Sequence, residues 1–177
     1  MGGWSESDVG FRPLAVGDLP LVYDWLGREH VRRWWGVRAD YEEAVAEYLA
    51  AIEGRDPTDL FVIVVAGEDA GLIQTYLLAD YPDYAALVGP GDEAAGLDIF
   101  LGNQRLTGSG LGTFAIRTFA SEVVFARAET QACVADPDVR NLASIRAFEK
   151  AGFTAVATFV DPEDDQVHAV LRLDRPR

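Results

Sequence analysis

The segment at residues 107–113, with the sequence TGSGLGT, has the composition of a loop that binds phosphate groups. Glycines at alternate positions let the backbone approach a ligand closely and leave several N–H groups pointing the same way. The pattern predicts a helix directly after the loop, and the positive end of that helix adds to the same seat. The loop is therefore a candidate pyrophosphate site. The same pattern also suits a tight strand-to-helix turn that binds nothing, and the glycines alone do not decide between the two.

A second pattern, NLASIRAFEKAGF, begins at Asn141. Asn141 and Ser144 are three residues apart on one face of a predicted helix, where both could bond a polar ligand lying alongside. Phe148 faces the core, and Gly152 supplies a left-handed C-cap. A well-capped amphipathic helix would explain Gly152 but not the asparagine and the serine.

Together the two patterns resemble the motifs of the GNAT acyltransferase superfamily. The loop matches the Q/R-x-x-G-x-G/A pyrophosphate turn at Gly110 and Gly112, with Thr107 where Gln or Arg is usual, and the helix matches N-x-x-S-x-R-x-x-E-K-x-G-F. The resemblance implies a GNAT fold with a central mixed, mostly antiparallel sheet of about six to seven strands flanked by helices. It also implies acetyl-CoA as co-substrate. The residues that match its binding positions are Phe100, Leu101, Gly108, Ser109, Gly110, Leu111, Gly112, Thr113, Asn141 and Ser144.

A narrower resemblance concerns the amine that is acylated. Five segments together look like those of the aminoglycoside 6'-N-acetyltransferases: residues 34–36, 74–76, 80–95, 96–98 and 136–137. The resemblance implies direct attack of the drug's 6' amine on acetyl-CoA, and hence aminoglycoside resistance. It implies that Asp98 lies beside the attacking amine and that Asp83 and Asp136 hold other amino groups. The positions that line the cleft in that family are matched by Trp35, Tyr48, Gln74 and Tyr76.

The chemistry of such a reaction suits Asp98. An aminoglycoside is a polycation, and its attacking ammonium must lose a proton before the nitrogen can reach the thioester carbonyl. Asp98 follows Gly-Leu and precedes Ile-Phe-Leu, so we expect its carboxylate to be partly desolvated, which raises a carboxylate pKa toward the range of a general base. We hypothesise that Asp98 accepts the proton directly or through one water.

Each of these residues also has a purely structural interpretation. Asp98 could pair with an arginine at a strand end, Asp136 could be a turn residue before a proline, and Asp83 could cap a loop turn. Tyr48 lies on the apolar stripe of its predicted helix, so core packing is its default role, and Trp35 could likewise be a core residue.

Phe148 departs from many GNAT enzymes, in which a tyrosine at this place often protonates the departing CoA thiolate. Phenylalanine has no proton to give, so water or Ser144 would protonate the thiolate. Alternatively the thiolate leaves unprotonated, since free thiols have pKa values near 8.5. Two alternative functions stay open: another GNAT N-acyltransferase, siderophore-type or protein N-terminal, and a catalytically weak protein that binds aminoglycosides. The spread of carboxylates and the long loop at residues 80–95 favour the polycation.

The elements that must position these residues follow an α+β order. Apolar spacing and caps predict helices at residues 19–27, 41–52, 111–127 and 141–151, and a short helix or turn at residues 29–36. Strands are predicted at residues 60–66, 72–79, 96–101, 130–134, 154–160 and 167–173. Residues 67–71 read as the turn of a hairpin, and residues 80–95 as a loop longer than most connections. We expect residues 1–10 to be a flexible N-terminal tail and residues 11–177 to form a single domain.

Composition narrows the class of protein. The 177 residues include 15 Lys and Arg against 29 Asp and Glu, a net charge of −14 that argues against nucleic acid as a partner and suits a cationic small molecule. The sequence holds no apolar stretch of membrane-spanning length and begins without a secretory signal pattern. A single cysteine, Cys133, fits the reducing cytoplasm, and the spacing of His30 and His168 predicts no metal. We expect a cytoplasmic monomer or homodimer without membrane partners.

Overall fold

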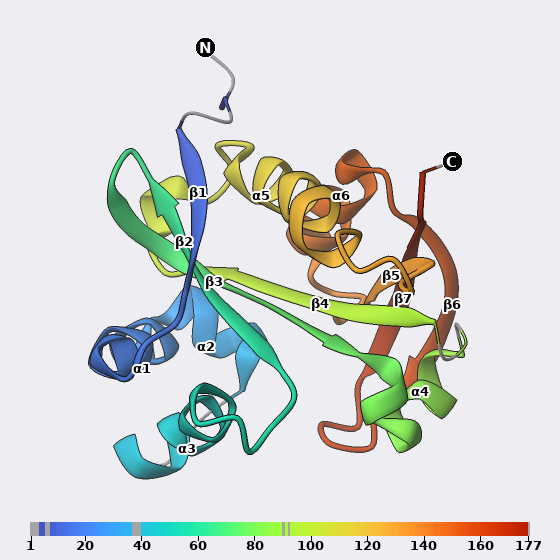
Figure 1. The fold of residues 1–177 in the computed structure, drawn as a ribbon, viewed down its shortest axis with the longest axis horizontal. Coiled ribbons are helices and arrows are strands. Elements are labelled where there is room, and N and C mark those ends of the chain that lie inside the picture. Colours follow the sequence, from blue (N-terminus) through green and yellow to red (C-terminus); the bar gives the residue numbers. More distant parts are fainter. Residues whose placement is uncertain (1–3, 6–7, 37–39, 90, 92, 177) are drawn as a thin grey trace. The chain divides into compact units, whose positions relative to one another are not determined.

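The computed structural model of the chain describes residues 4–5, 8–36, 40–89, 91 and 93–176. These residues form seven β-strands and six α-helices in the expected α+β order (Figure 1). The strands are β1 (Val9–Pro13), β2 (Asp59–Val65), β3 (Glu68–Leu77), β4 (Ala94–Leu101), β5 (Ala132–Ala135), β6 (Thr154–Val160) and β7 (Val167–Asp174). The helices are α1 (Leu19–Gly27), α2 (Glu29–Trp35), α3 (Tyr41–Ile52), α4 (Pro82–Val88), α5 (Leu111–Phe119) and α6 (Leu142–Ala151). Within the described ranges, no helix has the length and apolarity that a bilayer crossing requires.

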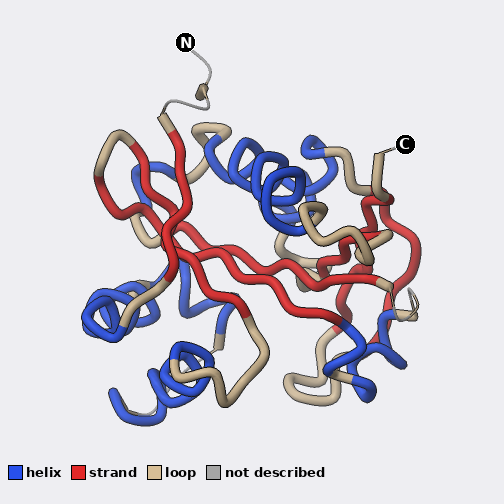
Figure 2. Tube along the Cα trace, viewed as in Figure 1, coloured by secondary structure: helices blue, strands red, loops and turns tan. Residues whose placement is uncertain are grey.

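The strands make one sheet in the order β1-β2-β3-β4-β5-β7-β6 (Figure 2, red). Antiparallel pairing joins β1 to β2, β5 to β7 and β6 to β7, whereas β4 and β5 run parallel. The predicted mixed, mostly antiparallel sheet flanked by helices is confirmed. The parallel pair is the feature that matters for the site, because parallel neighbours carry their C-terminal ends to the same edge of a sheet.

The chain forms two compact units: Met1–Gln74 with Ile99–Leu111, and Thr75–Asp98 with Gly112–Arg177. Strands β3 and β4 contribute residues to both units. Strand β1 begins at Val9, so the last two residues of the expected N-terminal tail belong to a strand. Residues 1–3 and 6–7 of that expected tail lie outside the described residues.

In the first unit, helix α1 contacts α2 and α3, and α3 contacts β2 (Figure 1). Helix α3 begins where the Asp40 side chain accepts a hydrogen bond from the Glu43 N–H, and its apolar face enters the core. Asp18 directly precedes α1, but its carboxylate accepts from Arg12 and from the Ala15 N–H and makes no capping bond to the helix. The buried residues of this core are Leu14, Leu19, Val22, Trp25, Leu26, Val31, Ala44, Val45, Tyr48, Leu60, Val62, Leu72 and Phe100.

In the second unit, helix α6 packs on β6 and β7. Its C-terminal Gly152 has a left-handed φ of 108°, as the sequence predicts, and Phe148 and Phe153 pack edge to face with centroids 5.0 Å apart. Burial raises the pKa of the Cys133 thiol, so this strand residue stays a neutral packing group. A second cluster of buried residues comprises Leu78, Val88, Ala94, Ala132, Val134 and Val170.

The prediction of a loop over residues 80–95 is wrong, because these residues contain helix α4. Pro82 lies in the first turn, where its missing N–H leaves no bond unmade. Gly89 ends the helix with a left-handed φ of 67°, and its N–H bonds to the Ala85 carbonyl. Both signals are present in the sequence, but the neighbouring turn-forming residues outweighed them in the prediction.

The turn between β2 and β3 is shorter than predicted. It consists of Ala66 and Gly67, with φ of 50° and 84°, so β3 begins at Glu68 and not at Leu72. Positive φ at both central residues is the geometry that matches the twist of a two-residue hairpin.

The helix predicted over residues 111–127 is α5 followed by a π-helical turn, Ala120–Val124. A π-turn adds one residue to a turn and rotates the residues that follow. Val124 and Phe125 are consequently buried, whereas Ala126 is exposed.

Candidate active site

The parallel strands β4 and β5 bring two of the predicted acidic residues to the place where the pairing of these strands ends. The last paired residues are Gly96 and Val134, and Asp98 and Asp136 each follow them by two positions. The same register therefore places Asp98, on β4, and Asp136, directly after β5, at matching positions of neighbouring segments. The structure shows Asp98 half-buried, which confirms the expected partial desolvation.

Tyr76 lies against both carboxylates. Its hydroxyl donates a hydrogen bond to Asp98, and both Asp98 and Asp136 are close enough to act on its ionisation. Burial, followed by these two negative charges, raises the pKa of Tyr76 well above its ordinary value. The phenol therefore stays protonated and serves as a neutral hydrogen-bonding group beside Asp98.

Gly96 makes room for the Tyr76 ring. A Cβ at this position would lie 2.3 Å from the Tyr76 Cζ atom, closer than non-bonded atoms approach. The ring thus lies directly on the backbone of β4, two residues before Asp98. Only glycine permits this approach, which explains the residue type in the Gly-Leu-Asp segment.

Tyr84 joins helix α4 to Asp136. Its hydroxyl donates to the Asp136 Oδ1 atom at 2.7 Å. Burial is the main cause that raises the pKa of Tyr84, with the neighbouring Tyr76 and Asp136 adding to it. Tyr81 and Tyr84 both contact the Tyr76 ring, with centroids 5.2 and 6.0 Å away. Tyr81 and Tyr84 are not among the residues that the sequence predicts for the site, because they lie in the segment predicted to be a loop.

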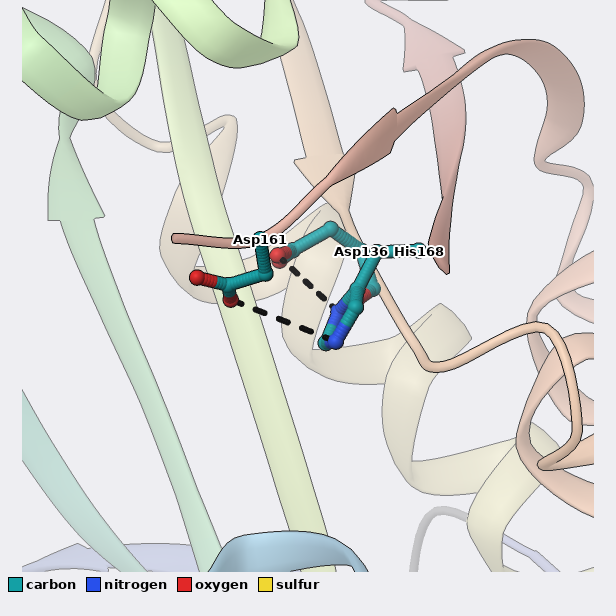
Figure 3. A group of neighbouring side chains, drawn as sticks. All are labelled: Asp136, Asp161 and His168. Carbon is teal, nitrogen blue, oxygen red and sulfur yellow. Dashed lines mark hydrogen bonds and ion pairs between the residues drawn. The ribbon is translucent and has the colours of Figure 1, made fainter. Parts of the chain in front are cut away.

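His168, on β7, lies beside Asp136 and contacts it (Figure 3). Its Nδ1 atom is 2.6 Å from the Asp136 carbonyl oxygen and 3.7 Å from that residue's carboxylate, while Nε2 is 3.2 Å from the Asp164 carboxylate. Hydrogen bonding to Asp136 is the largest of the effects that raise the pKa of His168 to about 9, against desolvation, which lowers it. The sequence offers His168 only as a possible metal ligand, and no spacing signal pairs it with Asp136.

The carboxylates around His168 also meet the distance condition for sharing a cation. Ligand atoms of Asp136, Asp161 and His168 lie within 4.8 Å of one another, as do those of Asp138, Asp164 and His168. A metal would need a free lone pair on the imidazole, but hydrogen-bond acceptors face both ring nitrogens. The donor set therefore fits a protonated ring among carboxylates rather than a metal centre.

Asp83 is not among the residues that meet at this cluster. Its side chain is exposed in the first turn of α4, next to Tyr84 in the chain. The exposed position leaves it available to a ligand but gives it no fixed orientation.

Gln74, at the end of the first unit's part of β3, is half-buried.

In the first unit, Trp35 and Tyr48 form a pair. The Trp35 indole Nε1 donates to the Tyr48 hydroxyl at 2.9 Å, and the indole packs edge-on to Phe100 with centroids 4.8 Å apart. Tyr48 is 2% exposed, so it belongs to the core, as its helical spacing also suggested. Its hydrogen-bond partner, Trp35, is half-buried, so Trp35 is the member of the pair that a ligand could reach.

The glycine loop before α5 is exposed and has the backbone conformation that its glycines allow. Gly108 and Gly110 have φ of 71° and 87°. The Ser109 hydroxyl donates to the Leu106 carbonyl at 2.6 Å, and that of Thr107 to the Gln104 carbonyl at 2.7 Å. Side chains therefore brace the loop from within, and the backbone N–H groups at the start of α5 remain the donors suited to a diphosphate.

Asn141, in the motif at the start of α6, has a structural role in addition to the ligand contact predicted for it. The Asn141 Oδ1 atom accepts from the Ser144 N–H at 3.2 Å, so Asn141 is the N-cap of α6. Capping thus accounts for the asparagine type, while Ser144 is half-buried. Phe148 is 3% exposed and cannot donate a proton.

The C-terminal end of β4 is held by two side chains of the first unit. His30 Nε2 is 2.9 Å from the Leu101 carbonyl oxygen, and Arg28 donates to the Gly102 carbonyl at 2.8 Å. Phe100 is buried and Leu101 is half-buried. These contacts hold the backbone at Leu101, one of the two β4 positions predicted to contact acetyl-CoA, and at the residue that follows it.

Comparison with known proteins identifies the class of this fold and site. The family model described as acetyltransferase (GNAT) domain matches residues 15–160, and the chain belongs to this family.

Aminoglycoside N(6')-acetyltransferase type 1 of Klebsiella pneumoniae is 30% identical over 171 residues, which cover 94% of this chain and 84% of that protein. The solved structure of AAC(6')-Ib with paromomycin and acetyl-CoA has a TM-score of 0.80 at 29% identity, covering 95% of this chain and 94% of its own. The structure of AAC(6')-Ib with coenzyme A and kanamycin has a TM-score of 0.79 at 28% identity, covering 94% and 95%.

Proposed function

We propose that this protein transfers the acetyl group of acetyl-CoA to the 6' amine of an aminoglycoside. The observation that carries the proposal is the placement of Asp98 and Asp136 at one edge of the parallel strand pair, braced by Tyr76, Tyr84 and His168. An acidic edge of this kind suits a ligand with several ammonium groups. The names of the similar proteins support the same substrate class. Acetylation removes a positive charge from the drug, which is the chemistry expected of a resistance enzyme.

Asp98 is the proposed general base. It would take a proton from the 6' ammonium, directly or through one water, and so release the nitrogen lone pair for attack on the thioester carbonyl. The Tyr76 hydroxyl, which hydrogen-bonds with Asp98, would hold the carboxylate toward the amine. Asp136 would bind a second ammonium group and so orient the sugar, which supplies positioning rather than proton transfer.

Acetyl-CoA, when bound, supplies the acetyl thioester. The backbone of the glycine loop and the first turn of α5 would bind its pyrophosphate, because their conformation and the helix N-terminus suit an anion. The proposed contacts are Gly108, Ser109, Gly110, Leu111, Gly112 and Thr113 for the pyrophosphate, Asn141 and Ser144 for the pantetheine arm, and Phe100 and Leu101 for the thioester end.

The remaining drug contacts have unequal support. Trp35 and Gln74 are half-buried and could each present one side to a ligand, and exposed Asp83 could pair with an outer ammonium group. Tyr48 would orient Trp35 through their hydrogen bond instead of touching the drug. We place the reaction in a reducing cytoplasm, as the single buried cysteine suggests.

An assay of thiol release tests the proposal. The purified protein is mixed with acetyl-CoA and kanamycin, and free CoA thiol is followed with time. Release that depends on kanamycin supports the proposal. Release only with a peptide N-terminus or another small amine would instead indicate a different acceptor, and kanamycin binding without release would indicate a protein that sequesters the drug.

A further inference from the structure

His168 is placed where a neutral side chain could not make all the contacts observed. The Asp136 carbonyl faces Nδ1 and the Asp164 carboxylate faces Nε2, and neither group can donate a hydrogen bond at neutral pH. A neutral imidazole carries one N–H and can satisfy only one of these acceptors. An imidazolium carries two N–H groups and can donate to both acceptors, so the geometry indicates that the ring is charged.

The ring also joins two segments of the second unit that both carry negative charge. One segment follows β5 and includes Asp136 and Asp138; the other is the β6–β7 turn, which includes Asp161 and Asp164. Figure 3 shows one carboxylate of each segment, Asp136 and Asp161, beside the ring. Carboxylates this close repel one another unless a cation lies between them. His168 supplies that cation at the centre, and Arg140 supplies a second one to Asp138.

We propose that His168 is a positioning residue of the acceptor site. Its imidazolium holds the backbone of Asp136 and ties the acidic β6–β7 turn to it, while the Tyr84 hydroxyl holds the Asp136 carboxylate from the side of α4. Asp136 is thereby fixed at both its backbone and its side chain, and its carboxylate faces an incoming ammonium group in one orientation. The inference rests on the proposed function, because it names what fixes a drug-binding carboxylate.

The positioning role makes the site sensitive to alkaline pH. When His168 loses its proton, the remaining N–H can keep the bond to the Asp136 carbonyl, but the bond to Asp164 is lost. The pKa of His168 in the folded protein, about 9, lies above the ordinary value of 6.5. Its contribution to stability is therefore complete below about pH 6.5 and is lost as the pH rises through about 9.

The charged groups that face the ring come from two segments. Asp136 and Asp138, with its partner Arg140, lie on the segment after β5, and Asp161 and Asp164 lie on the β6–β7 turn. The contact from β6 is the uncharged ring of Phe159, at a centroid distance of 5.7 Å. Each of the carboxylates favours the protonated ring.

The first test measures the charge of the ring without any substrate. The chain has two histidines, so ring-nitrogen NMR of the full protein between pH 5 and 10 gives two titrations, which a His30→Gln variant assigns. We expect the pKa of His168 near 9 and a lower value in Asp164→Asn, which removes the Nε2 partner. Asp165→Asn is the matched control, because this exposed neighbour has a φ of 58° that asparagine tolerates. A His168 pKa at or below 6.5 would overturn the proposal.

The second test compares kinetics of the native protein with His168→Asn. The asparagine amide can reach the Asp136 carbonyl as Nδ1 does, but it carries no charge and cannot reach Asp164. At pH 7 we expect the KM for kanamycin to be about fivefold higher in the variant, which corresponds to the loss of one modest hydrogen bond. We expect kcat and the KM for acetyl-CoA to change less than about twofold. The amines of the drug also titrate in this pH range, but they affect both proteins equally and so cancel in the ratio of native to variant kcat/KM. We expect this ratio to fall toward one as the pH rises through about 9, because the native His168 then loses its charge.

The possible failures are distinguishable. A ratio that is independent of pH, or an unchanged KM for kanamycin, would refute the positioning role while leaving the acetyltransferase function intact. Absence of turnover with any aminoglycoside would refute the proposed function and the positioning role together. A variant that does not fold is recognised by circular dichroism, and Asp164→Asn then replaces it, with the same expected direction in KM and in pH dependence.

Discussion

Replacement of Tyr84 by phenylalanine tests whether the orientation of Asp136 matters for drug binding. The change removes the hydroxyl that donates to Asp136 Oδ1 at 2.7 Å and leaves the ring, which packs on the buried cluster of the second unit. A hydrogen bond to a charged group contributes about 1.5–3 kcal/mol. The Asp136 side chain is 15% exposed, so water can replace part of the lost bond, and we reduce this to about 1–2 kcal/mol.

That free energy corresponds to a KM for kanamycin about 5–30-fold higher. We expect kcat to stay within about threefold, because Asp98 and the thioester site are untouched. Initial rates of thiol release over a range of kanamycin concentrations separate the two constants. Tyr23→Phe is the matched control, since its ring is 39% exposed and lies in the other unit, and it should leave both constants unchanged. An unchanged KM in Tyr84→Phe would refute the claim that this bond orients a drug-binding carboxylate.

Three further substitutions test other parts of the site. Asp98→Asn removes the proposed base, and we expect kcat at neutral pH to fall about 10²–10⁴-fold, with partial recovery at higher pH as free amine accumulates; full turnover at pH 7 would contradict the role. Gly96→Ala places a Cβ against the Tyr76 ring, and we expect a loss of stability of about 1–3 kcal/mol in urea unfolding together with slower turnover, whereas native stability would disprove the close packing. Gly110→Ala strains a backbone with φ of 87° by about 1–2 kcal/mol, which should raise the KM for acetyl-CoA about 5–30-fold and not that for kanamycin; the reverse pattern would argue against a pyrophosphate loop.

Local patterns predicted most of the fold. The helices at residues 41–52 and 142–151 have apolar residues at helical spacing and a glycine within two residues of their last turn, and both form as expected. Helix α4 was missed because its seven residues lie between turn-forming residues, and a short helix has too few apolar repeats to show a period. The π-turn after α5 was also unpredictable, because nothing in the local sequence fixes where an extra residue enters a helical turn.

The site could be predicted only where the chemistry lies in a local motif or in a resemblance. Asp98 and Asp136 were found through the resemblance, and the structure explains them through the register of β4 and β5. Tyr84 and His168 reach Asp136 from α4 and β7, over separations of 52 and 32 residues. Contacts of this kind depend on the pairing of strands across the fold, which no single-sequence pattern encodes.

The central claim is that the 6' amine of an aminoglycoside receives the acetyl group. Two aminoglycosides that differ at this position, one with a 6' amine and one with a 6' hydroxyl, are each incubated with the protein and acetyl-CoA, and the products are examined by mass spectrometry and NMR. We expect one added acetyl group, on the 6' nitrogen, in the first drug and no product from the second. Equal acetylation of both drugs, or an acetyl group on a different nitrogen, would contradict the account.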